Sequence, residues 1–211
     1  STQGYSSAAS DVYKRQLIES AKKEFLEHGF QNANLRRISS ESGVSTGSIY
    51  TRFGDKAGLF SAVVKPAADG LMELYLESIT AARESGDPAE ATSQGNEGTE
   101  LVLKYIYENF DVFKLIFCHS AGTEYERYFD ELAEIEEKYY REFVKQFSRR
   151  ENMVSDFFIH VICRTGWSYI YEVVSHDLSY DEAQIFMKSI REFCFAGWGK
   201  VLGQNYEDLG L

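Results

Sequence analysis

The chain of 211 residues carries 33 Asp and Glu against 22 Lys and Arg, a formal net charge of −11, and 44% of its residues are hydrophobic. This composition is ordinary for a water-soluble globular protein with a core of one or two domains. No apolar run approaches the roughly 18–20 residues that a membrane span needs, so we expect no membrane partner. The first residues lack the basic-then-apolar order of a secretion signal and indicate a short flexible lead-in. Because Cys118, Cys163 and Cys194 form no CxxC pair, we expect a cytoplasmic protein with reduced thiols.

The first third of the chain predicts a run of helices, because apolar residues recur at three- and four-residue spacing. Ser10 or Asp11 is expected to cap a first helix that ends near His28, with Gly29 as its stop. Two short helices follow, over residues 35–42 and 46–53. Their expected caps are Asn34 and Ser45, and Gly43 separates them.

The remaining elements are also expected to be helical, so that the fold is all-α. Asp55 caps a fourth helix from Lys56 to about Arg83, with a kink or break expected near Lys65 because Pro66 lacks a backbone donor. Residues 84–98 read as a loop by composition. Further helical patterns cover about 99–119, with a candidate break near Asp111, and then 122–148, 155–175 and 180–203.

Residues 35–53 fit a helix-turn-helix. Ile38, Val44, Ile49 and Phe53 are spaced to meet between the two short helices, and Gly43 suits the tight turn. The outer side of the second short helix is polar, which predicts that it reads the major groove of DNA.

The charge is distributed unevenly along the chain. Residues 1–60 hold eight Lys and Arg and six Asp and Glu, a net of +2, whereas residues 61–211 hold 14 and 27, a net of −13. A basic head on an acidic body is expected when only one end of a protein meets phosphate.

Residues 14–64 resemble the tetracycline-repressor (TetR) family of bacterial regulators. The first helix ends in EHGF, and NLRRISSESGVSTGSIYTRF and GDKAGLFSAV follow at the family's spacing. The resemblance implies a three-helix helix-turn-helix DNA-binding domain, residues 1–64. A larger helical bundle for ligand sensing and dimerisation, residues 65–211, would follow it.

The resemblance also implies the DNA contacts. Thr46, Ser48, Tyr50 and Thr51 would lie on or beside the recognition surface, and Asn34 and Lys56 would meet phosphate. Positions 51 and 52 are often aromatic in the family but are Thr51 and Arg52 here; Arg52 would contact a guanine or a phosphate. The predicted DNA-binding set is Asn34, Arg36, Arg37, Ser45, Thr46, Ser48, Tyr50, Thr51, Arg52 and Lys56. The alternative for each is a solvated surface side chain or, for Tyr50, a place in the core.

Aromatic side chains are frequent after residue 100 and form stripes at helical spacing. The functional interpretation is that some line a cavity for a flat or greasy ligand, with His160 or Arg164 orienting it. The alternative is ordinary core packing. The predicted ligand-binding set is Phe113, Phe117, Tyr128, His160, Cys163, Arg164, Trp167 and Tyr171.

A metal site is a weaker hypothesis. Cys118, His119, Glu124 and Glu126 are close in sequence, and His160 and His176 could join them, but the spacing matches no strong metal pattern. We therefore expect neither a metal nor a cofactor.

The last two helical patterns are expected to build a homodimer, because Phe186, Ile190, Phe193 and Trp198 add apolar surface to the last of them. Two recognition helices about 34–36 Å apart would read a palindromic double-stranded operator. The sequence thus predicts a transcriptional repressor that an unknown small-molecule effector releases from DNA.

The alternative is a DNA-binding protein without a ligand, acting through a protein partner or in chromosome organisation; a fully packed C-terminal core would favour it. No catalytic motif such as G-x-S-x-G or H-E-x-x-H occurs, so we expect no enzyme and no catalytic residue.

Overall fold

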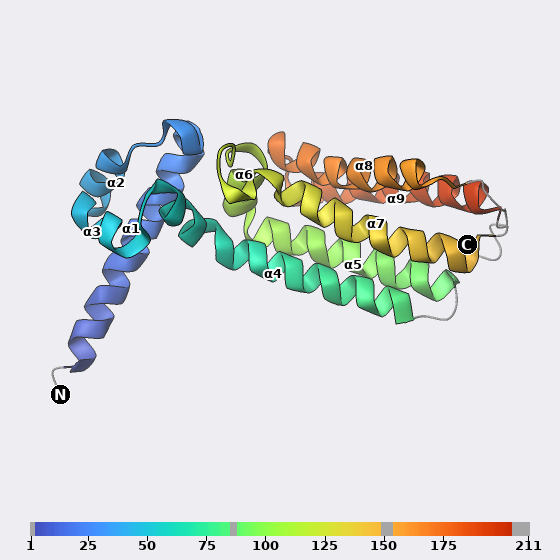
Figure 1. Cartoon of the computed structure of the whole chain (residues 1–211), viewed down its shortest axis with the longest axis horizontal. Coiled ribbons are helices and arrows are strands. Elements are labelled where there is room, and N and C mark those ends of the chain that lie inside the picture. The colour runs from blue at the N-terminus through green and yellow to red at the C-terminus, as the bar shows by residue number, and fades with distance from the viewer. Residues whose placement is uncertain (1–2, 85–87, 149–153, 204–211) are drawn as a thin grey trace. The chain divides into compact units, whose positions relative to one another are not determined.

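The computed structural model describes residues 3–84, 88–148 and 154–203. Within these residues the protein is all-α, as predicted, and contains no strand (Figure 1). The helices are α1 (Gln3–Asn32), α2 (Leu35–Ser42), α3 (Thr46–Phe53), α4 (Lys56–Glu84), α5 (Pro88–Glu108), α6 (Phe110–Cys118), the 3₁₀ helix η1 (Glu124–Arg127), α7 (Tyr128–Phe147), α8 (Asp156–Ser175) and α9 (Tyr180–Leu202).

The chain forms two compact units. Unit 1 comprises Ser1–Asp69 and Asn109–Glu126, and unit 2 comprises Gly70–Glu108 and Arg127–Leu211. Helix α6 therefore belongs with the N-terminal helices, which the sequence prediction of one boundary after residue 64 did not anticipate. The chain passes between the units within α4, at the α5–α6 junction and at the η1–α7 junction.

Most predicted helix ends are confirmed. Ser155 and Ser179 cap α8 and α9 by accepting hydrogen bonds from the backbone N–H groups of Phe158 and Glu182. The expected break near Asp111 occurs at Asn109, which leaves the helical conformation between α5 and α6.

Two predictions about helix boundaries were wrong. The first helix begins at Gln3 rather than near Ser10, because no Pro or Gly between residues 5 and 28 stops it; residues 1–2 lie outside the described part. Gly29 does interrupt it, with a positive φ of 69°. Most of the predicted 84–98 loop is the start of α5, with residues 85–87 outside the described part. Helix α4 continues through Pro66, so of the kink or break expected there only the break is contradicted.

The start of α5 is helical for a local reason and a tertiary one. Pro88 stands in the first turn, where its missing N–H has no helical partner to lose. Farther along, Gly98 passes so close to α4 that an added Cβ would lie 2.8 Å from the Cβ of Ser78. On α4, a Cβ on Gly70 would lie 2.1 Å from the hydroxyl of Tyr105. Both glycines allow α4 and α5 to pack closely in unit 2. Composition alone therefore misread Gly98 as a loop residue.

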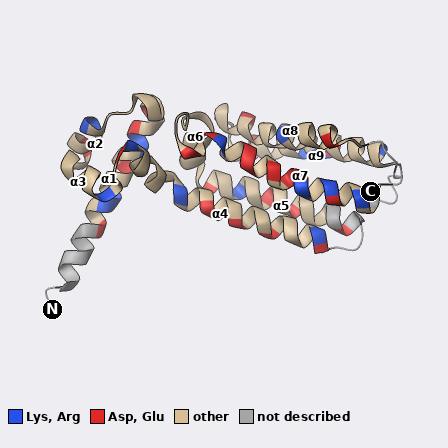
Figure 2. Ribbon diagram, viewed as in Figure 1, with Lys and Arg blue, Asp and Glu red and all other residues tan. Residues whose placement is uncertain are grey.

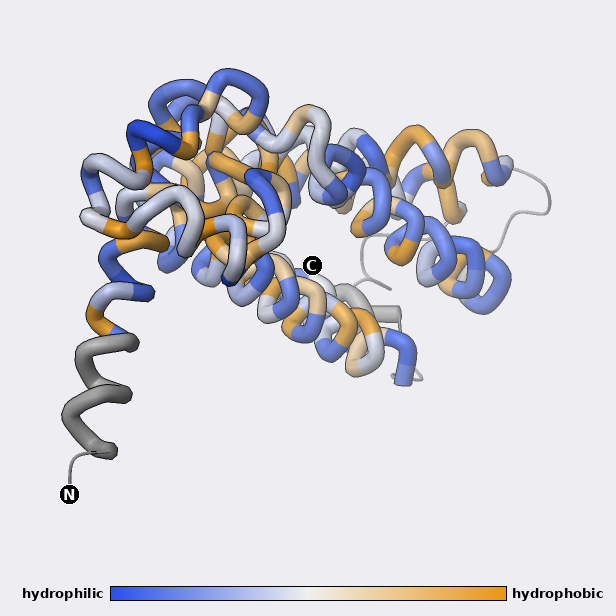
Figure 3. The backbone as a smooth tube through the Cα atoms, turned by 60° about the vertical axis from the view of Figure 1, so that its left-hand side comes forward, coloured by the Kyte–Doolittle hydropathy of each residue, from blue (hydrophilic) through white to orange (hydrophobic). Residues whose placement is uncertain are grey.

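Unit 1 is built around an aromatic core. The rings of Phe25 on α1 and Phe60 on α4 are fully buried with centroids 5.0 Å apart, and Phe30 lies 5.4 Å from Phe60. Helix α6 packs on α1, and the backbone N–H of Phe30 donates to the carbonyl of His119 (3.1 Å). Hydrophobic segments accordingly gather where the helices of this unit meet (Figure 3).

Charged residues recur along the helices of unit 2, with acidic positions on α4, α5 and α7 (Figure 2). None of the helices in the described residues is long and apolar enough to cross a membrane.

Candidate DNA-binding surface and ligand cavity

Side-chain caps fix the start of both short helices. The Oδ1 atom of Asn34 accepts a hydrogen bond from the N–H of Arg36 (2.8 Å), and Oγ of Ser45 accepts one from the N–H of Ser48 (3.1 Å). Each cap satisfies a backbone donor that a helix N-terminus leaves free. The predicted boundaries of α2 and α3 are therefore confirmed.

The turn between α2 and α3 has the predicted geometry. Gly43 adopts a left-handed conformation with φ of 70°, which a residue with a Cβ rarely takes. Ile38 and Ile49 are fully buried, whereas Val44 and Phe53 are half-buried. This small core orients α3 against α2.

The outer face of α3 is exposed and polar. The side chain of Tyr50 is 53% exposed, and Arg52 and Ser48 are exposed beside it. Thr51 is also exposed, although its hydroxyl donates to the carbonyl of Gly47 (2.9 Å). Tyr50 therefore lies on the surface rather than in the core, the alternative that the sequence left open. Thr46 is half-buried at the first turn.

A buried carboxylate links α1 to α2. Glu24 is 6% exposed and accepts hydrogen bonds from the backbone N–H of Asn34 (2.8 Å) and from Nε of Arg37 (2.9 Å). Burial raises the pKa of Glu24, but the hydrogen bonds from these two donors and the charge of Arg37 outweigh burial, so the pKa lies below its usual value. Arg37 is thus bound to Glu24 on one side, whereas Arg36 is exposed.

Lys56, which the sequence predicts to contact phosphate, donates hydrogen bonds to backbone carbonyls at and just after the end of α1. Its Nζ donates to the carbonyls of Gln31 (2.9 Å) and Ala33 (3.2 Å) and lies 4.8 Å from the ring centroid of Phe30. These carbonyls follow the interruption at Gly29 and need a donor there. A phosphate contact would have to share or replace these bonds.

Unit 2 contains a cavity of about 530 Å³ between α4, α5, α7, α8 and α9. Its wall is mainly aromatic and aliphatic, as in many small-molecule sites. The aromatic members are Tyr75, Tyr139, Tyr140, Phe143, Phe158, Trp167, Tyr169, Phe193, Phe195 and Trp198.

The cavity wall also holds the unsatisfied polar atoms of the fold. Among the described residues, three buried side-chain atoms lack a hydrogen-bond partner: Oη of Tyr75, Nε1 of Trp167 and Nε of Arg191. All three residues line this cavity. Because buried polar groups are normally paired, these atoms mark positions where a bound molecule could supply the partner.

Glu136 of α7 is the acidic member of the same wall. Burial raises its pKa to about 8, while the nearby indole N–H of Trp167 acts in the opposite direction. Burial together with the charge of Glu136 raises the pKa of Tyr139 to about 12. No described residue forms an ion pair with Glu136.

Comparison with known proteins begins with the N-terminal residues. Residues 17–63 match the family model described as bacterial regulatory proteins, tetR family. The HTH-type transcriptional repressor AcnR of Corynebacterium glutamicum is 35% identical over 65 residues, which are 31% of this chain and 35% of AcnR. Residues 17–63 thus carry the sequence pattern of the tetR family, and the likeness in sequence is confined to this N-terminal part of the chain. The chain spans only about a third of the length of the curated relatives it matches.

Solved structures extend the likeness in fold to most of the chain. A TetR-family regulator from Syntrophomonas wolfei shares 16% identity at a TM-score of 0.63, covering 93% of this chain and 98% of its own. FadR from Bacillus subtilis, solved in complex with stearoyl-CoA, shares 14% identity at a TM-score of 0.58, covering 85% and 96%. At these identities the likeness establishes the fold alone.

Only Trp167 of the eight ligand-binding residues predicted from sequence lines the cavity of unit 2. Phe113 and Phe117 lie on α6 in unit 1, with ring centroids 5.7 Å apart. Cys163 and Tyr128 are buried away from the cavity wall, and Tyr171 is partly exposed.

His160 and Arg164 join α8 to α7 instead of facing the cavity. Nε of Arg164 donates to Nε2 of His160 (3.2 Å), so Nδ1 of His160 carries the proton donated to Glu137 (2.8 Å). Arg164 also forms an ion pair with Asp130. Because each group has a partner, this network stabilises the contact between the two helices.

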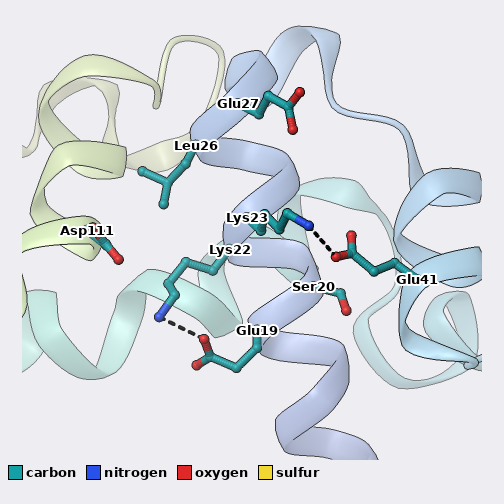
Figure 4. Close-up of a pocket in the computed structure, with 8 residues that line it drawn as sticks. All are labelled: Glu19, Ser20, Lys22, Lys23, Leu26, Glu27, Glu41 and Asp111. Carbon is teal, nitrogen blue, oxygen red and sulfur yellow. Dashed lines mark hydrogen bonds and ion pairs between the residues drawn. The ribbon is translucent and has the colours of Figure 1, made fainter.

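A second hollow, of about 590 Å³, lies on unit 1 between α1, α2 and α6 (Figure 4). Most of its wall is charged, and the charges pair with each other: Lys22 with Glu19 (2.9 Å) and Lys23 with Glu41 (2.7 Å). Such a wall suits water better than an apolar ligand. The described residues also contain no cluster of three His, Cys, Asp or Glu placed to hold a metal ion.

Sequence reasoning missed Glu136, Tyr75 and Tyr140 as cavity residues. The sequence did contain a signal that Glu136 faces inward, because Glu136 is four residues from the buried Leu132 and four from the cavity residue Tyr140. Positions four apart share a helix face, so Glu136 must point inward with them.

Proposed function

We propose that this protein is a transcriptional repressor that binds operator DNA through α3 and leaves it when a small molecule occupies the cavity of unit 2. The observation that carries the proposal is the exposed polar face of α3, with Tyr50 and Arg52, on a capped and packed helix-turn-helix. The relative AcnR, named as an HTH-type transcriptional repressor, supports this over its 65 matched residues.

The N-terminus of α2 contributes to the proposed DNA contact. Asn34 caps the start of α2, and Arg36 presents an exposed cation beside it. We place the DNA phosphate backbone against this helix end, next to α3. Lys56 and Arg37 act first as internal supports, since each already binds an oxygen within unit 1. Both hold the segment that sets the position of α2.

A homodimer supplies the second recognition helix. Helices α8 and α9 carry large apolar side chains on the surface: Phe157 and Phe193 are 74% and 72% exposed, and Val161 and Ile185 are also exposed. A second copy would bury this surface, and the two α3 helices would then read half-sites about 34–36 Å apart.

Ligand response is proposed from the cavity and the path of the chain. The cavity is lined by α4, α5 and α7, and each of these helices contains or adjoins a point where the chain passes into unit 1. A ligand that favours one packing of these helices biases the spacing of the recognition helices. A coupling of about 1–3 kcal/mol would weaken DNA binding about 5–150-fold. The cavity favours this function over DNA binding without a ligand.

The test is selection of genomic fragments by the purified protein, followed by binding measurements on the enriched DNA. Tyr50→Ala and Arg52→Ala are expected to weaken binding at least about tenfold each without unfolding the protein, since both side chains are exposed. Lys104→Ala, which removes an exposed cation of α5, should bind like the wild type. Equal losses in all three variants would contradict recognition by α3.

A further inference from the structure

The cavity wall contains a carboxyl group with no cation to balance it. The carboxylate oxygen Oε2 of Glu136 lies 3.8 Å from the position that a Cβ on Gly166 would occupy, so α8 packs directly against it. No described Lys, Arg or His forms an ion pair with it. Burying a carboxyl group without a partner opposes its ionisation, so the residue is costly unless a positive charge enters.

Aromatic rings cluster around this carboxyl group. Burial is the main cause that raises the pKa of Tyr75, Tyr139 and Tyr140, and the charge of ionised Glu136 raises the pKa of each further. All three rings therefore lie close enough to interact electrostatically with Glu136. Tyr140 stacks on Trp198 with ring centroids 5.0 Å apart and an interplanar angle of 2°. Faces of Tyr and Trp rings attract a desolvated cation.

Two unpartnered donors stand beside the carboxyl group. The rings of Tyr75 and Trp167 are 5.0 Å apart, and neither Oη of Tyr75 nor Nε1 of Trp167 has a hydrogen-bond partner. Both donors can stabilise carboxylate oxygens once Glu136 ionises. The wall is therefore equipped to hold the negative form when a cation arrives.

We propose that the effector is a lipophilic cation, an amine or quaternary ammonium on an apolar body, with Glu136 as its counter-ion and the aromatic rings around the positive group. This inference rests on the proposed ligand-responsive function. An anionic effector would lie against the carboxyl group of Glu136, which disfavours a second negative charge. Arg191, the cation in the wall, is already bound to Glu100 (Nη1 to Oε1, 2.7 Å).

The test uses three probes with one alkyl chain: dodecyltrimethylammonium, dodecan-1-ol and dodecanoate, each below the concentration at which it forms micelles. The only two tryptophans of the chain, Trp167 and Trp198, both line the cavity, so their fluorescence reports its occupation directly. We expect the cation to bind at least about tenfold more tightly than the alcohol or the carboxylate.

The decisive variant is Glu136→Gln, which keeps the size of the side chain. It should weaken binding of dodecyltrimethylammonium at least about tenfold and leave dodecan-1-ol unchanged, which also shows that the variant is folded. Glu134→Gln, an exposed carboxyl on the same helix, serves as the control and should bind all three probes like the wild type. Tightest binding of dodecanoate, equal binding of alcohol and cation, or absence of any fluorescence change would overturn the inference.

Operator binding by the ligand-free protein separates this test from that of the proposed function. If DNA is bound but the cation is not preferred, the inference fails and the repressor function stands. If the cation binds through Glu136 but no DNA fragment is enriched, the repressor function fails instead.

Discussion

Gly58 on the first turn of α4 offers a quantitative test of how the recognition helix is held. A Cβ built on Gly58 would lie 1.9 Å from the backbone oxygen of Phe53, the last residue of α3, and contacts below 3.0 Å are essentially never seen for real Cβ atoms. Substitution by alanine must therefore separate α3 from α4 by about 1.1 Å at this point. A backbone oxygen cannot swing aside as a flexible side chain would.

The expected cost of Gly58→Ala follows from two opposing effects. Overpacking costs about 1–3 kcal/mol, and the upper end applies because the clash is with backbone. Alanine is favoured over glycine in a helix by about 1 kcal/mol, so the net loss of unfolding free energy is about 2 kcal/mol. Operator affinity should fall as well, because relief of the clash displaces the end of α3.

Urea unfolding measured by far-UV circular dichroism tests this estimate. Gly47→Ala in α3 is the control, since its Cβ would meet only Oγ of Ser45 at 3.9 Å and should be neutral or stabilising by up to about 1 kcal/mol. Tryptophan fluorescence follows unit 2 separately, as both tryptophans lie there. A Gly58→Ala protein as stable as the wild type would refute the packing argument.

Three further predictions concern carboxyl groups and a cap. Glu24→Gln should lower the free energy of unfolding by about 1–3 kcal/mol at pH 7. It should also reduce the loss of stability at acid pH, because the lowered pKa of Glu24 stabilises the folded protein above pH 4.5, and this stability is lost as pH falls through the pKa of the folded state. The exposed control Glu27→Gln should change neither the free energy of unfolding nor its dependence on pH. For Glu136 the sign is opposite: its raised pKa of about 8 makes the wild type lose stability between pH 4.5 and 8. Glu136→Gln should therefore be the more stable protein at pH 9, unlike Glu134→Gln, in thermal unfolding across this range. Ser179→Ala removes the capping box of α9 and should cost about 1 kcal/mol in urea unfolding; no change would show that the box contributes nothing.

The helix-turn-helix could be predicted from sequence because its determinants are local. Caps at Asn34 and Ser45 and the left-handed turn at Gly43 each depend on residues within a few positions. Burial of Ile38 and Ile49 follows from spacing across a single turn. Local rules also located the ends of α8 and α9.

The cavity could not be predicted in the same way, because five helices that are distant in sequence form it. Aromatic stripes showed that α8 has an inward face but not which of its side chains reach the cavity. They therefore did not separate Trp167, which lines the cavity, from Cys163, which is buried in the core. His160 and Arg164 gained partners only through packing of α7 on α8. Close approach at Gly98 likewise depends on α4, which explains why a helical segment read as a loop.

The most direct test of the central claim is a footprint of the purified protein on its enriched DNA at several salt concentrations. We predict two protected half-sites about one helical turn apart with palindromic sequence, and affinity that falls as salt rises. Protection that is uniform along every fragment, or a single unpaired site, would contradict a dimeric repressor that reads DNA through α3.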